Sequence, residues 1–390
     1  MDSIISALTT SSFAWPLQFC LFSTVVTYIA SVLTSNVSQV DRVWTFLPLI
    51  YTAYFALLPL WPLEQTIPLL PFVPSDLQSE SQDIFWSPRA LILLFLVTIW
   101  MFRLSYNTYR RGLFSLSDED YRWAVLRAQL PPFLFQLVNL TFIAATQNLL
   151  LLTLGYPAYL ASMQKPQMLY SDAFLELWAL GVLLIEFTAD NQQFVYQTYK
   201  HAYLDHFRKA ASSSAAHTHA LEVASKAAWP FASPSPAQSI STANASDSGR
   251  TLLTNLRLTP TEAHRGFITS GFWAYSRHPN FACEQTFWWI ICFIPFSARA
   301  YPLVMFGDGA VTSFLEMIMS ALENIKSTFT FTHFPNPTSL TSLTPFLPLL
   351  PALLLSILFF SSTLYTEAIS KSKYPLPTPL TKLESRCLPF

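Results

Sequence analysis

The stretch GFWAYSRHPNFACEQTFWW, residues 271–289, places several hydrogen-bonding side chains among aromatic and apolar ones. These polar side chains are Tyr275, Arg277, His278, Asn280 and Glu284. Pro279 suits the first turn of a helix because it has no backbone N–H to leave unpaired, so we expect a helix from Asn280 onward. Arginine, histidine and backbone N–H groups at a helix N-terminus bind anions. The stretch therefore predicts an anion site at the mouth of an apolar helix.

The rest of the chain has the composition of a membrane protein. Of its 390 residues 52% are hydrophobic and 12% are charged, and the mean hydropathy is +0.36. Soluble domains are about 25% charged. The apolar residues form blocks near the length of about twenty residues that a helix needs to cross a bilayer. Seven blocks qualify, roughly 13–34, 44–61, 87–104, 132–158, 173–190, 280–297 and 345–364. We predict an all-α, polytopic membrane protein with about seven transmembrane helices.

Basic residues are concentrated in alternate loops, and this sets the predicted orientation. Lysine and arginine are enriched in the cytosolic loops of membrane proteins. They occur in 105–131, at the start of 191–270 and in the tail after 364, whereas 62–86 has acidic residues and no lysine or arginine. Seven spans place all the basic loops in the cytosol if the N-terminus is lumenal and the C-terminus is cytosolic.

The segment 207–262 interrupts the apolar pattern. It is rich in alanine and serine, and we expect a flexible cytosolic insertion with at most a short helix at 217–227. It separates the first five predicted helices, within 1–206, from a C-terminal part, 263–390. That part contains the stretch quoted above, the last two predicted helices and a cytosolic tail.

Several classes of function do not fit the sequence. The formal net charge of −1 gives no broad field for nucleic acid. The four cysteines, Cys20, Cys283, Cys292 and Cys387, form no CxxC motif or Cys/His cluster at metal-ligand spacing, so we expect no metal site. Gly307 and Gly309 lack the third glycine of a dinucleotide-binding turn.

Polar residues in or beside predicted spans are costly and are therefore candidate functional residues. Arg103, Tyr106 and Asn107 are spaced three and four apart, so they share one face of a helix. A shared face favours a ligand pocket over snorkelling of the arginine to the headgroups. Asp41 and Arg42 precede the second predicted span, and they are either a local ion pair or part of a site.

Two further clusters occur at the ends of apolar helices. Asp190 and Gln193 share a face at the end of the fifth predicted span, where they either join two helices or bind a ligand. Glu367 and Lys371, followed by Tyr374, come after the last span and are either topology anchors or a wall of the same site. All these clusters lie on the predicted cytosolic side. This arrangement is typical of an enzyme that takes a soluble anionic cofactor from the cytosol and an apolar substrate from the lipid.

The segments resemble a known family. The stretch 271–289 resembles the glycine–aromatic–tyrosine–serine–RHPNY–glycine–glutamate signature of the membrane family DUF1295. That family belongs with the steroid 5-alpha-reductase C-terminal group and, more distantly, with the isoprenylcysteine carboxyl methyltransferases. Other segments agree in order: SNVSQVDRVWTFLP, WMFRLSYNTYRRGLFSLSDEDYRW, FQLVNLTFIAATQNLLLL, ADNQQF and STLYTEAISKSKYP. Cys283 replaces the glycine of the signature and Phe281 replaces its second tyrosine.

The resemblance implies an NADPH-dependent reductase of a carbon–carbon double bond in a lipid such as a sterol, a polyprenol or a fatty-chain enone. The C-terminal half would bind NADPH at a site facing the cytosol, and the N-terminal half would hold the lipid, in the endoplasmic reticulum membrane. By position, the cofactor contacts are Arg103, Asp190, Asn280, Glu284 and Tyr374, with Arg277 and His278 beside them. From the clusters above we add Asn107, Gln193, Tyr275, Glu367 and Lys371.

The proton donor of such a reaction is less clear-cut in the sequence. The steroid reductases use a glutamate in an early helix to orient the substrate carbonyl, and the second predicted span here has no acidic residue. Tyr51, Tyr54 or Tyr106 would then supply the proton, and Asp41 is the nearest carboxylate. We name Tyr106, Tyr51 and Asp41 as catalytic candidates.

Two other functions stay open at this point. A methyltransferase using S-adenosylmethionine would share the Arg-His-Pro element, and a non-catalytic membrane protein that binds lipid would share the helices. The cations Arg103, Arg277, His278, Lys371 and Lys373 favour the phosphates of NADPH over the single carboxylate of S-adenosylmethionine.

Overall fold

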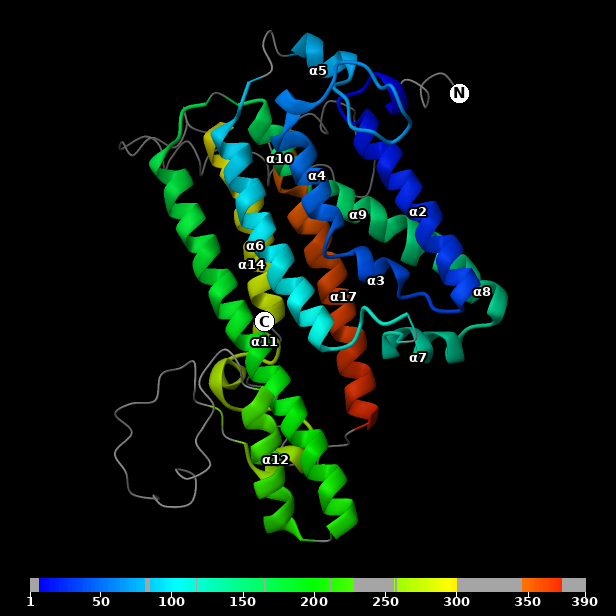
Figure 1. Ribbon diagram of the computed structural model, residues 1–390, viewed down its shortest axis with the longest axis vertical. Helices are drawn as coiled ribbons and strands as arrows, with labels where there is room; N and C mark the ends of the chain where they lie inside the picture. The colour runs from blue at the N-terminus through cyan, green and yellow to red at the C-terminus, as the bar shows by residue number, and fades with distance from the viewer. Residues whose placement is uncertain are drawn as a thin grey trace, which may run out of the picture. The chain divides into compact units, whose positions relative to one another are not determined.

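The computed structural model (Figure 1) describes residues 7–80, 85–116, 118–164, 166–210, 212–227, 256, 258–299 and 346–373, and every regular element in these ranges is a helix. The chain forms two compact units. Unit 1 is Met1–Leu180 with Trp288–Leu358, and unit 2 is Gly181–Phe287 with Phe359–Phe390. The prediction of an all-α chain is confirmed for the described residues.

The helices follow the predicted apolar blocks closely at the N-terminal end. Unit 1 contains α2 (Ala14–Thr34), α3 (Gln39–Val43), α4 (Leu47–Ala56), η1 (Leu58–Leu60), α5 (Ser75–Glu80), α6 (Pro88–Arg110), α7 (Tyr121–Gln129), α8 (Pro132–Val138), the π-helical η2 (Asn139–Thr146), α9 (Gln147–Thr153) and α10 (Tyr156–Ser162). Unit 2 contains α12 (Ser213–Ala227), α13 (Pro260–Arg265) and η4 (Gly271–Ala274). Three helices contribute residues to both units: α11 (Tyr170–Ala210), α14 (Pro279–Arg299) and α17 (Leu350–Lys373).

Four helical segments of the described chain are long and apolar enough to cross a membrane. They are Ala14–Thr34, Pro88–Arg110, Pro132–Ser162 and Phe346–Ile369. These four correspond to the predicted blocks 13–34, 87–104, 132–158 and 345–364. The chain therefore has the helices of an integral membrane protein.

The other three predicted blocks differ from these four. In block 44–61 the helix α4 has ten residues, which rise about 15 Å and cover about half of the hydrocarbon layer. Block 173–190 lies in α11, where Glu186 and Asp190 interrupt the apolar sequence. Block 280–297 lies in α14, which carries Glu284. α11 and α14 are long enough to span a bilayer, but neither is among the four apolar segments.

Unit 1 is held together by close contacts between apolar helix faces. In Figure 1 α4 lies beside α6 and α10, and Leu93, Leu96 and Val97 of α6 are fully buried. Trp100 of α6 is also fully buried and meets Trp288 of α14 edge to face, with ring centroids 5.0 Å apart. Such aromatic pairs stabilise beyond the area that they bury.

Polar side chains join α2 to the kinked helical segment from α8 to α9. Asn139 donates to the Ser31 hydroxyl at 2.8 Å, and Asn148 donates to the Thr27 hydroxyl at 3.2 Å. All four side chains are buried. Because both segments are candidate membrane spans, these bonds satisfy polar groups that lipid could not, and they fix the helices against each other.

Unit 2 contains a helical hairpin formed by α12 and the second half of α11. Buried alanines of α12 pack against buried tyrosines of α11: Ala216, Ala220 and Ala224 against Tyr196, Tyr199 and Tyr203. The Tyr199 hydroxyl lies 2.6 Å from Nδ1 of His217. The segment 207–262 is therefore not flexible throughout, because 213–227 and 260–265 are packed helices. The predicted short helix at 217–227 is present and begins at Ser213.

Candidate functional site

The stretch that opens the sequence analysis forms the entry to α14. The turn η4 covers Gly271–Ala274, and α14 begins at Pro279 as predicted. Gly271 has φ +64°, where other residues are strained, and a Cβ atom there would lie 2.5 Å from Oε1 of Gln192 and displace its amide group. Gln192 is buried and accepts a hydrogen bond from the Phe272 backbone N–H at 2.9 Å. The entry to α14 is thus anchored on α11.

Arg277 and His278 converge on a single carboxylate of α17. Nη1 of Arg277 lies 3.3 Å from Oε1 of Glu367, and Nε2 of His278 lies 3.6 Å from the same oxygen. The three side chains are 19–26% exposed, so they are shielded from water but accessible to a ligand. The structure brings together three of the predicted cofactor-binding residues in unit 2.

The first turn of α14 makes a second polar contact. Nδ2 of Asn280 donates to Oδ1 of Asp190 at 3.3 Å, and the indole of Trp273 donates to the Ala189 carbonyl at 3.0 Å. Asp190 is 4% exposed, and Glu284, one turn beyond Asn280, is 5% exposed. Asp190 and Asn280 therefore meet in one polar cluster of unit 2, and Glu284 is buried one turn further along α14.

Two acceptor atoms of this polar set are buried and unpaired within the part of the chain that the structure describes. They are Oε1 of Gln193 and Oδ1 of Asn280. A buried acceptor without a hydrogen-bond partner costs about 1–3 kcal/mol. Such atoms are satisfied when a ligand with N–H or O–H groups binds, so they mark this cluster as a candidate ligand site.

Other predicted cofactor residues of unit 2 lie outside the cluster. The Tyr275 side chain is 78% exposed. Lys371 belongs to α17, but the position of its side chain is outside the described part of the structure. Tyr374 also lies outside the described residues. Gln192 was not predicted, because it falls one residue off the helical face shared by Asp190 and Gln193.

The pKa of His278 gives the site a pH dependence. Burial lowers this pKa below its ordinary value of 6.5, Glu367 acts in the opposite direction, and Arg277 adds to the lowering. The unfolded chain then binds the proton of His278 more strongly than the folded protein does. Protonation therefore favours unfolding, and the free energy of unfolding decreases as the pH falls through 6.5 toward the lower pKa of the folded state.

We therefore expect the melting temperature to fall on acidification from pH 7.5 to pH 5.5, and to fall less in His278→Gln. Thermal unfolding of the two proteins across this range measures the difference. His201→Gln, which changes an exposed histidine of α11, serves as the control. Parallel curves for wild type and His278→Gln would contradict the assignment.

In unit 1, Asp41 is held away from Arg42. Its Oδ2 accepts a hydrogen bond from the Trp123 indole at 3.1 Å, and burial raises its pKa above the ordinary value. Arg42 instead donates from Nη2 to the carbonyls of Ser115 and Asp118, at 2.7 Å each. The interpretation of Asp41 and Arg42 as a local ion pair is wrong, because the short loop between α6 and α7 takes up the arginine.

Two side chains on the predicted face of α6 contact a further arginine. Arg103 and Asn107 are buried and Tyr106 is half-buried. Oδ1 of Asn107 accepts hydrogen bonds from Nε and Nη2 of Arg110, at 3.1 Å and 2.9 Å, and the Arg110 guanidinium lies 5.1 Å from the Tyr106 ring centroid. Arg110, three residues after Asn107 and four after Tyr106, is thus a further member of this group, although its sequence context suggested a loop residue.

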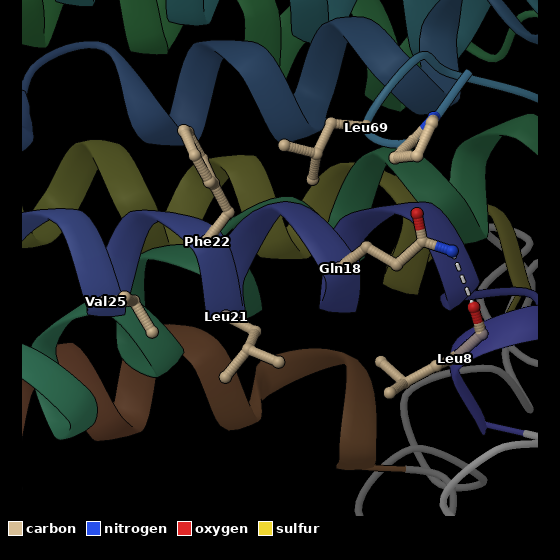
Figure 2. Close-up of a pocket in the computed structure, with 7 residues that line it drawn as sticks. Leu8, Gln18, Leu21, Phe22, Val25 and Leu69 are labelled. Carbon is tan, nitrogen blue, oxygen red and sulfur yellow. Dashed lines mark hydrogen bonds between the residues drawn. The ribbon is translucent and has the colours of Figure 1, made fainter.

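The last catalytic candidate of unit 1 lies in an apolar surrounding. Tyr51 is fully buried in α4, with its ring 6.1 Å from that of Phe19. Figure 2 shows an open groove along α2, lined by Leu8, Gln18, Leu21, Phe22, Val25, Pro68 and Leu69. None of the predicted site residues lines it. Within the described ranges no group of three or more His, Cys, Asp or Glu side chains could hold a metal ion.

Four apolar helices long enough to cross a bilayer, with a polar cluster at the entry to α14, define a helical integral membrane protein. The chain belongs to the family described as Protein of unknown function (DUF1295), whose model matches residues 27–326.

A relative in fission yeast is similar over part of its length. The uncharacterized protein C594.04c of Schizosaccharomyces pombe is 27% identical over 261 residues, which cover 66% of this chain and 57% of that protein. The match therefore spans little more than half of the relative. No solved structure matches the chain.

Proposed function

We propose that the protein is an NADPH-dependent membrane reductase of a carbon–carbon double bond in a lipid, related to the steroid 5-alpha-reductases. The lipid class is a sterol, a polyprenol or a fatty-chain enone. The observation that carries the proposal is the polar cluster of unit 2, where Arg277, His278 and Glu367 meet. In a chain this apolar, an arginine, a histidine and unpaired acceptors at one helix entry favour a charged, hydrogen-bonding cofactor.

The chemistry of this cluster suits NADPH. A guanidinium forms charge-assisted hydrogen bonds to phosphate, and Arg277 is positioned at the entry to α14 for that role. The buried acceptors Oε1 of Gln193 and Oδ1 of Asn280 suit amide and ribose donors. When bound, NADPH supplies a hydride to the β-carbon of the conjugated double bond. Lys371 and Tyr374 are assigned to the same cofactor by position.

The reduction also consumes a proton, which the chain must supply. The candidates for this role are Asp41, Tyr51 and Tyr106. Asp41 is the strongest of them, because burial raises the pKa of its carboxyl and so favours the protonated form that can donate. The hydrogen bond from Trp123 fixes the carboxyl in one orientation.

The proposal includes a topology. With the predicted blocks 44–61, 173–190 and 280–297 added to the four apolar segments, seven membrane spans put the N-terminus in the lumen and the C-terminus in the cytosol. The basic loops then lie in the cytosol, and the polar cluster faces the cytosolic pool of NADPH. We place the protein in the endoplasmic reticulum membrane on the resemblance to the reductases.

Cofactor binding to the purified protein tests the proposal. We expect NADPH at about 100 times its dissociation constant to stabilise the wild type in detergent by about 2.7 kcal/mol, and NADH less. Arg277→Ala is expected to lose this stabilisation. Arg265→Ala is the matched control, because Arg265 lies in the same unit but packs over the Phe267 ring, 5.7 Å from its centroid. Thermal unfolding with and without each nucleotide gives the comparison.

Each other outcome points to a different function. Stabilisation by S-adenosylmethionine in place of NADPH would make the protein a methyltransferase related to the isoprenylcysteine carboxyl methyltransferases. Stabilisation by none of the three ligands would favour a non-catalytic protein that binds lipid. An equal loss in Arg277→Ala and Arg265→Ala would mean that the effect is one of general stability.

A further inference from the structure

The residue Arg42 is buried in unit 1 with most of its hydrogen-bonding capacity unused. It is 8% exposed and follows the end of α2 by eight residues, on the short helix α3. Its Nη2 atom donates to the carbonyls of Ser115 and Asp118. Its Nε and Nη1 atoms are buried and have no hydrogen-bond partner among the described residues. A guanidinium is always charged, so these unpaired donors are costly.

A second unpaired donor, the hydroxyl of Thr45, lies on the same helical face as Arg42. Thr45 is 1% exposed, and its hydroxyl is buried without a partner in the described part of the chain. Residues 42 and 45 are three apart and Trp44 between them has helical backbone angles, so the two side chains lie on one face. Together they offer three N–H groups, one on Nε and two on Nη1, and one O–H group to a single acceptor-rich ligand.

The acidic residues near Arg42 do not serve as that ligand. Glu119 is paired with Arg127 at 2.6 Å, and Asp120 is paired with Arg122 at 2.9 Å. Asp41 is turned toward Trp123, and its raised pKa favours the neutral form. Asp118 contacts Arg42 through its backbone carbonyl, not its carboxylate. Burial lowers the pKa of Arg42, and the carboxyl groups of Asp41, Asp118 and Glu119 oppose this lowering from a distance.

We propose that Arg42 and Thr45 bind the phosphate group of an anionic lipid whose apolar chains stay in the bilayer. A phosphate has the several acceptor oxygens that unpaired N–H and O–H groups require. The place supports a lipid: Arg42 lies just beyond a candidate span, where headgroups are found. Apolar surface is also exposed beside it, at Phe46 and Leu116. The proposal does not rest on the reductase function.

The test uses the full-length protein in a neutral detergent with dioleoyl phosphatidic acid as the probe. Dioleoylglycerol has the same chains without the phosphate, and inorganic phosphate has the anion without the chains. We expect only phosphatidic acid to raise the melting temperature of the wild type. Because hydrogen bonds to a charged group are lost, Arg42→Lys is expected to weaken binding about tenfold or more. Thr45→Val removes one donor at nearly constant shape and is expected to weaken it less.

Arg111→Gln is the control, because it removes an exposed cation from the adjoining loop. Unchanged binding in this variant supports the proposal. Equal stabilisation of wild type, Arg42→Lys and Thr45→Val by phosphatidic acid would overturn it. So would equal stabilisation by inorganic phosphate or by dioleoylglycerol, because the ligand would then be free phosphate or any apolar chain. Stabilisation by NADPH is measured on the same samples. If Arg42→Lys loses this stabilisation, Arg42 belongs to the cofactor site. If NADPH stabilises none of the samples, the reductase proposal fails and the lipid result is unaffected.

Discussion

Replacing Arg89 with alanine is expected to lower the free energy of unfolding by about 3–5 kcal/mol, as for other buried ion pairs that lose one partner. Nη2 and Nε of Arg89 bind the two carboxylate oxygens of Asp172 at 2.8 Å and 3.1 Å. The remaining N–H groups bind Oε1 of Gln164 at 3.1 Å and the Gln167 carbonyl at 2.9 Å. The side chains of Arg89 and Asp172 are 4% and 1% exposed. Alanine would leave the Asp172 carboxylate buried with one remaining donor, the Leu169 backbone N–H.

Three further variants separate this effect from a general loss of charge. Arg122→Ala breaks an ion pair whose side chains are 29% and 15% exposed, and it is expected to cost about 0–1 kcal/mol. Arg89→Lys keeps the positive charge but loses the bidentate hydrogen bonds to Asp172. Arg89→Met with Asp172→Leu removes both charges, and it is expected to recover most of the stability lost by Arg89→Ala. Thermal unfolding in one detergent compares them. A melting temperature of Arg89→Ala equal to that of Arg122→Ala would contradict the prediction.

The ion pair between Arg89 and Asp172 also marks a limit of reasoning from sequence. The two residues are 83 apart, and neither has an oppositely charged residue three or four positions away that would identify a local pair. Hydrophobic blocks, by contrast, are local, so α2, α6 and the segment α8–α10 could be predicted with nearly their observed bounds. α4 could not, because apolar residues on both sides of a short helix extend the block beyond its end at Ala56.

Part of the candidate site could also be predicted, because some of its residues lie in local sequence patterns. Asp190 and Asn280 were expected in one site from their spacing and resemblance, and they are hydrogen-bonded. Helical spacing is less reliable for the rest of α11. It favoured Gln193 over Gln192, yet Gln192 holds the turn before α14. One of the two alternatives for Asp41 and Arg42 was a local ion pair, because they are adjacent, but consecutive side chains on a helix point about 100° apart. Each then meets a different partner.

Replacing Gly155 with alanine is expected to lower the free energy of unfolding by about 3 kcal/mol, at the upper end of the cost of overpacking a core. Gly155 precedes α10 and has φ −80°, so its backbone accepts any residue. A Cβ atom there would lie 2.6 Å from Cβ of Tyr51 and 3.3 Å from its backbone carbon. Neither atom can move aside by rotating a side chain, and Tyr51 is fully buried. The methyl group must therefore push α4 and α10 apart.

Gly181 provides a matched control for this prediction in the same chain. It lies inside α11, and a Cβ atom there would meet nothing within 4 Å. Alanine has a higher helix propensity than glycine, so Gly181→Ala is expected to leave stability unchanged or to raise it by up to about 1 kcal/mol. The two variants add the same methyl group, and thermal unfolding of both against wild type isolates the packing at Tyr51. If Gly155→Ala melts at the same temperature as Gly181→Ala, then α4 and α10 do not approach as closely as the distance of 2.6 Å requires.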